Sequence, residues 1–106
     1  MANKIYLLKI FGTISSAKQK EFEQTIRFAV NLLPSTCISS HLSMDVFNSN
    51  TYHFFTLWRT PSDMAAFRRS NEFDLIRGAF QALGVLDRSF VGELIDEQVY
   101  DESHDP

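Results

Sequence analysis

The sequence predicts an α+β fold in which a four-stranded antiparallel sheet packs against helices. Two stretches carry the prediction. Tyr52–Trp58 is dense in aromatic and β-branched side chains and contains no Gly or Pro, which is typical of a strand inside a sheet. Thr60 and Pro61 then end this strand and begin a helix, because a Thr hydroxyl can cap a helix and Pro suits its first position. Around these stretches, strand-like and helix-like runs follow the order β-α-β-β-α-β.

The chain begins with a strand expected over Lys4–Thr13, which is apolar on both faces and therefore suits the interior of a sheet. Ser16 and Gln19 have the spacing of a capping box. Apolar side chains then recur at helical spacing until Pro34, which ends the helix. The solvent-facing side of this helix is expected to carry Lys18, Lys20, Glu21, Glu23 and Arg27.

A hairpin is predicted next. Thr36–Phe47 alternates between two faces, and Asn48-Ser49-Asn50 is turn chemistry leading into the aromatic strand. After the helix that begins at Pro61, a second helical segment follows Ser70-Asn71, and Leu86–Ile95 is expected to form the last strand.

Right-handed crossovers place both helical segments on one face of the sheet, in the ferredoxin-like arrangement. By strand parity, the side facing the helices carries Tyr6, Leu8, Ile10, Leu42, Met44, Phe54, Trp58, Phe90 and Leu94. The opposite side carries Ile5, Leu7, Phe11, Phe47, Phe55, Leu57, Val91 and Ile95. Such a face is too apolar to remain in water, and the chain has no third layer to cover it. We therefore expect a homodimer that packs sheet against sheet.

The length and charge of the chain indicate its domain organisation and the partners that it can bind. The chain of 106 residues is expected to form a single domain over residues 1–95, followed by an acidic C-terminal extension over 96–106. Without that extension the chain has 10 basic and 8 acidic side chains, which is not the footprint of a nucleic-acid-binding protein. The aromatic strand also lacks the Gly and basic residues of an RNA-recognition sheet. A single Cys37 and the lack of a long apolar run favour a cytoplasmic protein that does not enter a membrane.

Several side chains are candidates for a binding site. Trp58 can stack on a flat ligand and donate one hydrogen bond, and Tyr6 or Tyr52 can add a phenol to the same cavity. For all three, plain packing in the core is the alternative. His41 and His53 share one face of the hairpin and can act as bases or ligands, but two His make a poor metal site, and a structural role at the dimer interface is favoured.

The remaining polar candidate is Arg68, which belongs to a group of four arginines that can receive an anionic compound. The alternative is that it complements the dipole at a helix C-terminus. No metal site is expected.

The run FTLWRTPSDMAAFRRSNEF, which includes Trp58 and Ser70-Asn71-Glu72-Phe73, resembles the antibiotic biosynthesis monooxygenase family of dimeric α+β barrels. The resemblance extends from Lys4 to about Ile95. It implies a homodimer with a small pocket between helices and sheet in each subunit. Because several members oxygenate quinols or polycyclic phenols without metal or flavin, it implies a cofactor-independent monooxygenase acting on a small aromatic or quinol-type compound. Other members of the family degrade haem.

The sequence departs from the family at two positions. Phe67 and Arg68 stand where the family commonly has a His, and Phe54 stands where oxygenating members can carry an Asn. With Phe80, Phe54 and Phe67 would form an apolar canopy rather than a proton relay. The alternative function is therefore a non-catalytic module for ligand binding or assembly on the same dimeric fold.

Overall fold

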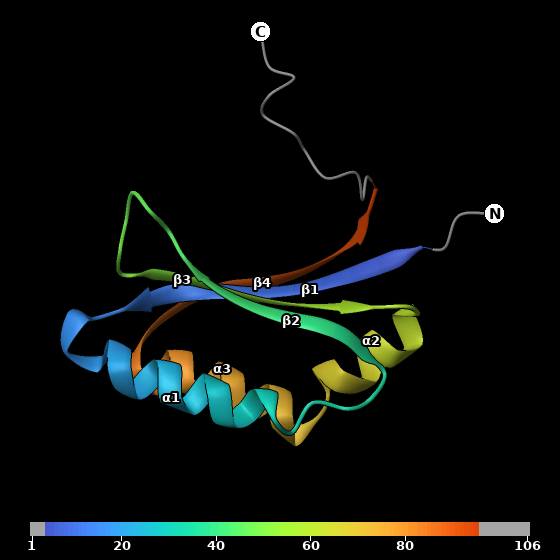
Figure 1. Cartoon of the computed structure of the whole chain (residues 1–106), viewed down its shortest axis with the longest axis horizontal. Coiled ribbons are helices and arrows are strands. Elements are labelled where there is room, and N and C mark those ends of the chain that lie inside the picture. Colours follow the sequence, from blue (N-terminus) through green and yellow to red (C-terminus); the bar gives the residue numbers. More distant parts are fainter. Residues whose placement is uncertain (1–3, 96–106) are drawn as a thin grey trace, which may run out of the picture.

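The computed structural model describes residues 4–95, and the acidic extension predicted over 96–106 lies outside them. Figure 1 shows one antiparallel sheet above a layer of helices. The strands lie side by side in the order β2-β3-β1-β4, which is the ferredoxin-like order and confirms the predicted fold class. Their bounds are β1 Ile5–Ile14, β2 Cys37–Met44, β3 Thr51–Trp58 and β4 Gly84–Leu94.

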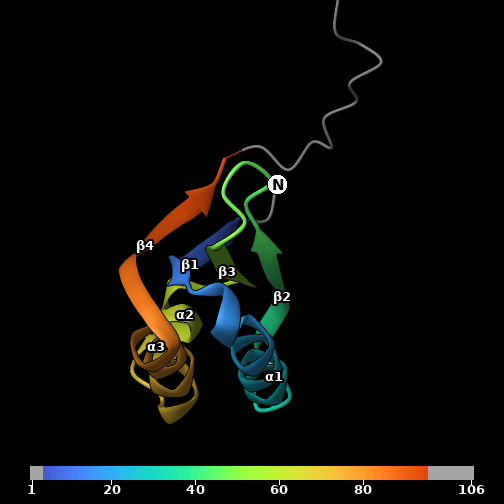
Figure 2. The same cartoon turned by 90° about the vertical axis from the view of Figure 1, so that its left-hand side faces the viewer.

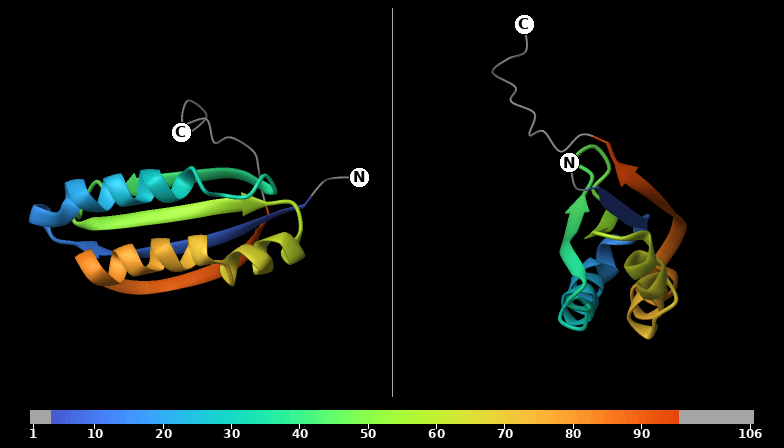
Figure 3. Two further views of the ribbon diagram at one scale, coloured as in Figure 1. Left: turned by 90° about the horizontal axis from the view of Figure 1, so that it is seen from below. Right: turned by 90° about the vertical axis from the view of Figure 1, so that its right-hand side faces the viewer.

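All helices lie on one face of the sheet, as predicted (Figure 1; Figure 3). A 3-10 turn over Ser16–Lys18 leads into α1, and the short α2 leads into α3. Figure 2 shows α1 and α3 side by side beneath the sheet, with α1 under the β2 side. The helices span α1 Gln19–Val30, α2 Pro61–Arg68 and α3 Asn71–Leu83. None of the helices within residues 4–95 is long and apolar enough to cross a membrane.

The helix starts in the second half of the chain follow from local hydrogen bonding. The Thr60 hydroxyl oxygen accepts a hydrogen bond from the Asp63 backbone N–H at 3.0 Å, and Pro61 is the first residue of α2, as predicted. The Ser70 hydroxyl oxygen likewise accepts from the Phe73 backbone N–H at 3.2 Å.

The capping box predicted at Ser16 and Gln19 is wrong. Because the helix is entered through a 3-10 turn, Ser16 does not occupy the cap position. The Gln19 amide instead reaches the hairpin turn, where its Nε2 donates to Asn50 Oδ1 at 2.9 Å and to the Ser49 carbonyl at 3.1 Å. Gln19 therefore ties the start of α1 to the turn between β2 and β3.

The core lies between the sheet and the helices. It is built from the helix-facing residues of β1 and β3 and from large aromatic side chains of the helices. Phe22 of α1 packs against Phe80 of α3, with ring centroids 4.8 Å apart. The largest fully buried side chains are Trp58, Phe22, Phe54, Phe73 and Phe80.

Beyond a bulge at Asp87, the last strand presents the opposite faces to those predicted, whereas Leu86 lies on the predicted helix side. Phe11 pairs with Arg88 while Gly12 pairs with Leu86, so Asp87 is an extra residue that forms a bulge and reverses the alternation. A Cβ on Gly12 would lie 2.4 Å from the Val85 carbonyl oxygen, so this close approach requires glycine.

The bulge corrects the predicted faces of three side chains in β4. Phe90 pairs with Lys9 and Leu94 with Ile5, which places both on the face away from the helices. Val91 pairs with Leu8 and faces the helix side. The alternation of β1 and β3 agrees with the prediction, and that of β2 agrees from Ser39 onward. A register shift before Ser39 pairs Cys37 with Trp58 and places it on the helix side, opposite to the predicted face.

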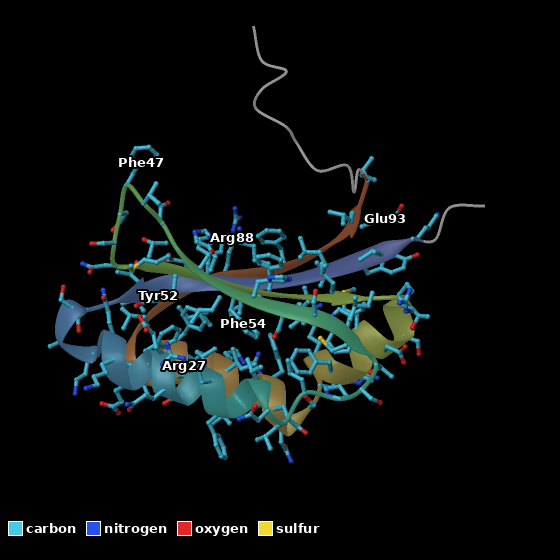
Figure 4. All side chains as sticks on the ribbon, in the orientation of Figure 1. Arg27, Phe47, Tyr52, Phe54, Arg88 and Glu93 are labelled. Carbon is cyan, nitrogen blue, oxygen red and sulfur yellow. The ribbon has the colours of Figure 1, made fainter. Side chains whose placement is uncertain are left out.

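The hairpin strand is also shorter than predicted. β2 ends at Met44, because the Asp45 carboxylate accepts hydrogen bonds from the backbone N–H groups of Phe47 and Asn48 and starts the turn. Phe47 is therefore 98% exposed at the loop tip rather than part of the sheet face (Figure 4).

Candidate functional site

A groove of about 690 Å³ opens between α1 and the β2–β3 hairpin, on the helix side of the sheet. β2 is an edge strand, and its helix-facing side chains are only partly covered: Leu42 is half-buried and Met44 is 44% exposed. Figure 4 shows Arg27, Tyr52 and Phe54 around it. Its lining consists of Glu23, Ile26, Arg27, Val30, Asn31, Ser40, Leu42, Ser43, Met44, Tyr52 and Phe54.

The groove combines an apolar floor with one polar cluster. The floor is formed by α1 and the two hairpin strands through Ile26, Val30, Leu42, Met44 and Phe54. A flat hydrocarbon ring placed there would remove apolar surface from water on both sides, which favours binding at roughly 25 cal/mol per Å². The dimensions and the lining are those of a site for a small molecule.

The polar cluster consists of Tyr52, Glu23 and Arg27. The Tyr52 hydroxyl donates a hydrogen bond to Glu23 Oε2, and Arg27 Nη2 lies 3.5 Å from Glu23 Oε1. Exposure rises along the cluster: Tyr52 is 2% exposed, the Glu23 side chain 33% and the Arg27 side chain 72%. A buried phenol, a half-exposed carboxylate and a solvated cation therefore lie in sequence from the floor to the rim.

Tyr52 acts here as a hydrogen-bond donor and not as a base. Burial, followed by the hydrogen bond to Glu23 and its negative charge, raises the pKa of Tyr52 to about 12. Its hydroxyl is therefore neutral around physiological pH. The Glu23 carboxylate has about four acceptor positions, of which Tyr52 uses one, while Arg27 forms an ion pair with it.

Trp58, the first candidate from the sequence, lies in the closed core. It is 0% exposed, and its ring stacks on Phe67 with centroids 5.0 Å apart. Its Nε1–H donates to Thr56 Oγ1 at 2.7 Å, so the one hydrogen bond that the indole can offer is already used. Phe73 packs edge-on against Phe67 and fills the space beyond.

The structure therefore divides the predicted pocket residues. Tyr52, Phe54, Trp58, Phe67 and Phe80 are all buried in the core. Tyr52 and Phe54 also border the groove, whereas the other three do not. Tyr6, the cross-strand partner of Trp58, packs half-buried against that core.

The two histidines lie on the open face of the sheet, on the side that strand parity predicts. The His41 ring stacks on Phe55 and the His53 ring on Phe11, with centroids 4.7 Å and 5.2 Å apart. Burial, and then the charge of Lys9, lowers the pKa of His53, whose Nδ1 is buried without a hydrogen-bond partner. Across residues 4–95, no three His, Cys, Asp or Glu side chains gather closely enough to hold a metal ion.

The cation of the groove is not one of the arginines selected from the sequence. Arg68 is exposed at the end of α2 and does not line the groove. Arg27 lines it together with Glu23, although helical periodicity assigned both to the wet side of α1. The i,i+4 spacing of this pair was visible in the sequence, but its contact with Tyr52 was not, because 29 positions separate Glu23 from Tyr52.

No protein-family model and no curated protein matches the sequence. Solved structures do match the fold. SnoaB, a cofactor-independent oxygenase from Streptomyces nogalater, superposes with a TM-score of 0.66 over 92% of this chain and 97% of its own, at 16% sequence identity. A protein from Nitrosomonas europaea, provisionally named an antibiotic biosynthesis monooxygenase, has a TM-score of 0.69 over 89% of this chain and 91% of its own, at 9% identity.

A conserved protein from Methanosarcina mazei Go1 is equally similar, with a TM-score of 0.69 at 15% identity over 87% of this chain and 92% of that one. These identities are too low to carry an activity from one protein to another, because one fold supports many functions. The resemblance inferred from the sequence is thus confirmed at the level of architecture: this chain has the fold of the antibiotic biosynthesis monooxygenase proteins.

Proposed function

We propose that the chain is a member of the antibiotic biosynthesis monooxygenase family that binds a small aromatic compound of the phenol or quinol type in the groove and oxygenates it without metal or flavin. The observation that carries the proposal is the groove itself, an apolar slot with one polar cluster at its edge. The fold shared with SnoaB, a cofactor-independent oxygenase, supports the reaction class.

The proposed chemistry needs only the substrate and dioxygen. A proton leaves the substrate hydroxyl, the delocalised phenolate passes one electron to dioxygen, and the two radicals join at a ring carbon that still carries its hydrogen, which forms a peroxide. The peroxide takes the proton back and loses water together with that hydrogen, which leaves a carbonyl group. One oxygen atom of dioxygen therefore ends in the product and the other in water. In this scheme Glu23 accepts the proton and becomes neutral as the anion forms, later returns the proton to the peroxide, and the apolar floor holds the ring and limits water.

We also propose that two copies pair through the open faces of their sheets. Half-buried or exposed apolar side chains cover that face, including Phe90, which is 40% exposed. Lys9 lies over the rings of Phe11 and Phe90, at 5.7 Å and 5.5 Å from their centroids, so its charge is partly accommodated by aromatic faces. A two-fold pairing would remove this surface from water without a further layer from the chain.

A second function, ligand binding without turnover, is favoured by the closed packing around Trp58. The indole N–H is bonded to Thr56 and the ring is covered by Phe67, so neither is available to a bound compound. Under this alternative the groove holds its ligand and Glu23 serves only as a hydrogen-bond acceptor.

Oxygen uptake with a panel of quinols and anthrones, measured together with binding of the same compounds, tests the proposal. We expect uptake above the rate of autoxidation, abolished in Met44→Trp, which fills the groove, and kept in Val46→Trp, which changes an exposed loop residue close by. Binding without uptake would favour the non-catalytic function. Failure of the whole panel to bind would contradict both.

A further inference from the structure

We propose that Glu23 sets the charge selectivity of the groove, so that a neutral hydroxyl-bearing aromatic compound binds and an aromatic carboxylate of the same shape is rejected. This inference rests on the proposed role of the groove as the ligand site. Glu23 is a specificity determinant here, whether or not the ligand is turned over.

The first support is the small number of charges at the groove. Among its lining residues, Glu23 and Arg27 are the only ionised side chains, and the others are apolar or carry neutral hydroxyl and amide groups. The electrostatic preference of the site therefore depends on which of these two charges a ligand senses more strongly.

The two charges differ in how far water screens them. The Arg27 side chain is 72% exposed and touches Glu23 at a single distance of 3.5 Å, so solvent and salt weaken its field. Glu23 is only 33% exposed and lies against the buried Tyr52 ring. A ligand on the apolar floor is therefore closer to the negative member of the pair than to an effective positive charge.

Tyr52 already shows what this environment does to a phenol. Its hydroxyl is held neutral, with a pKa raised to about 12, by burial and by the adjacent carboxylate. A phenolic ligand that enters beside it meets the same carboxylate. The neutral hydroxyl is favoured and an anionic group is repelled.

Glu23 also has the acceptor capacity that the proposal requires. Tyr52 occupies one acceptor position on Oε2, Arg27 lies 3.5 Å from Oε1 as an ion pair, and each carboxylate oxygen has a further lone pair. A ligand hydroxyl can therefore donate to Glu23 without displacing Tyr52. A ligand carboxylate has no proton to donate and would meet like charge.

The test uses 2-naphthol and 2-naphthoate, which share a ring system and differ in charge at neutral pH. Binding of each is measured by calorimetry to the full chain, to Glu23→Gln and to Glu21→Gln. Gln at position 23 can still accept from Tyr52, so the variant changes charge with little change of shape. Glu21 lies on the same helix but outside the groove lining, which makes it the matched control.

We expect the unaltered chain and Glu21→Gln to bind 2-naphthol at least about tenfold more tightly than 2-naphthoate, which corresponds to ~1.4 kcal/mol. In Glu23→Gln that ratio should collapse or invert, because Arg27 then acts on the ligand alone. Circular dichroism and thermal unfolding confirm that each variant is folded.

The outcomes separate this inference from the function on which it rests. If both compounds bind and Glu23→Gln leaves their affinity ratio unchanged, the inference is overturned while the groove remains a ligand site. Preferred binding of 2-naphthoate to the unaltered chain would overturn it as well. If neither compound binds, the proposed ligand site and the inference fall together.

Discussion

Replacement of Tyr52 by Phe should remove a component of stability that depends on alkaline pH. In the folded chain the pKa of Tyr52 is raised from 10 to about 12 by burial, by its hydrogen bond to Glu23 and by the charge of Glu23. Because folding favours the neutral phenol, this stabilisation is complete below pH 10 and is lost as the pH rises through 12. At ~1.4 kcal/mol per pKa unit, the loss amounts to about 2–3 kcal/mol.

The assay is urea unfolding of the unaltered chain and of Tyr52→Phe at a series of pH values from neutral to pH 12. At neutral pH the variant should be less stable by about 1–3 kcal/mol, because a hydrogen bond to a charged group is lost. As the pH approaches 12 the two free energies of unfolding should converge. Two curves that stay parallel to the highest pH would contradict the raised pKa of Tyr52. So would a phenolate absorbance that appears at pH 10 in the folded chain and is missing from Tyr52→Phe.

Three further predictions concern packing and the open face. Trp58→Phe should lower the free energy of unfolding by about 2 kcal/mol through lost contacts and loss of the indole hydrogen bond to Thr56 Oγ1, yet leave 2-naphthol affinity unchanged. A large loss of affinity in a stable variant would place the ligand beneath the indole. Gly12→Ala should lower the free energy of unfolding in chemical denaturation by at least about 2 kcal/mol, because the added Cβ meets the Val85 carbonyl oxygen at 2.4 Å. Gly92→Ala is the control, since its Cβ meets nothing within 4 Å and should have a small effect. The folded chain favours the neutral form of His53, so this contribution to stability is present above pH 6.5 and is lost as the pH falls through its lowered pKa. His53→Gln should therefore flatten this part of the plot of unfolding free energy against pH. An unchanged plot would contradict the prediction.

The fold could be predicted from the sequence wherever short-range chemistry determines it. Thr60 and Pro61 mark a strand end and a helix start within a few residues, and the structure places β3 and α2 on either side of them. The alternation of helix-facing and outward-facing side chains in β1 and β3 could also be predicted from the sequence. The face of β4 was not, because its bulge depends on the approach of Gly12 to Val85, two residues that are distant in sequence.

The candidate site was harder to predict for the same physical reason. Helical periodicity separates a buried stripe of side chains from a solvent-facing side, and by that rule Glu23 faces solvent. It lines a groove because α1 lies beneath the β2–β3 hairpin, where Tyr52 of β3 donates a hydrogen bond to its carboxylate. The sequence drew attention to Trp58 because large aromatic residues occur both in pockets and in cores, and residue type does not separate these environments.

The proposed ligand site lies between α1 and the hairpin and not beneath Trp58. Amide and indole N–H resonances of the ¹⁵N-labelled chain, followed during a titration with 2-naphthol, test it directly, since Trp58 is the single Trp and gives one indole signal. We predict that the largest shifts occur at Glu23, Arg27, Leu42 and Tyr52, while the indole resonance stays in place. A titration that moves the Trp58 indole signal and leaves the groove amides unchanged would contradict the account.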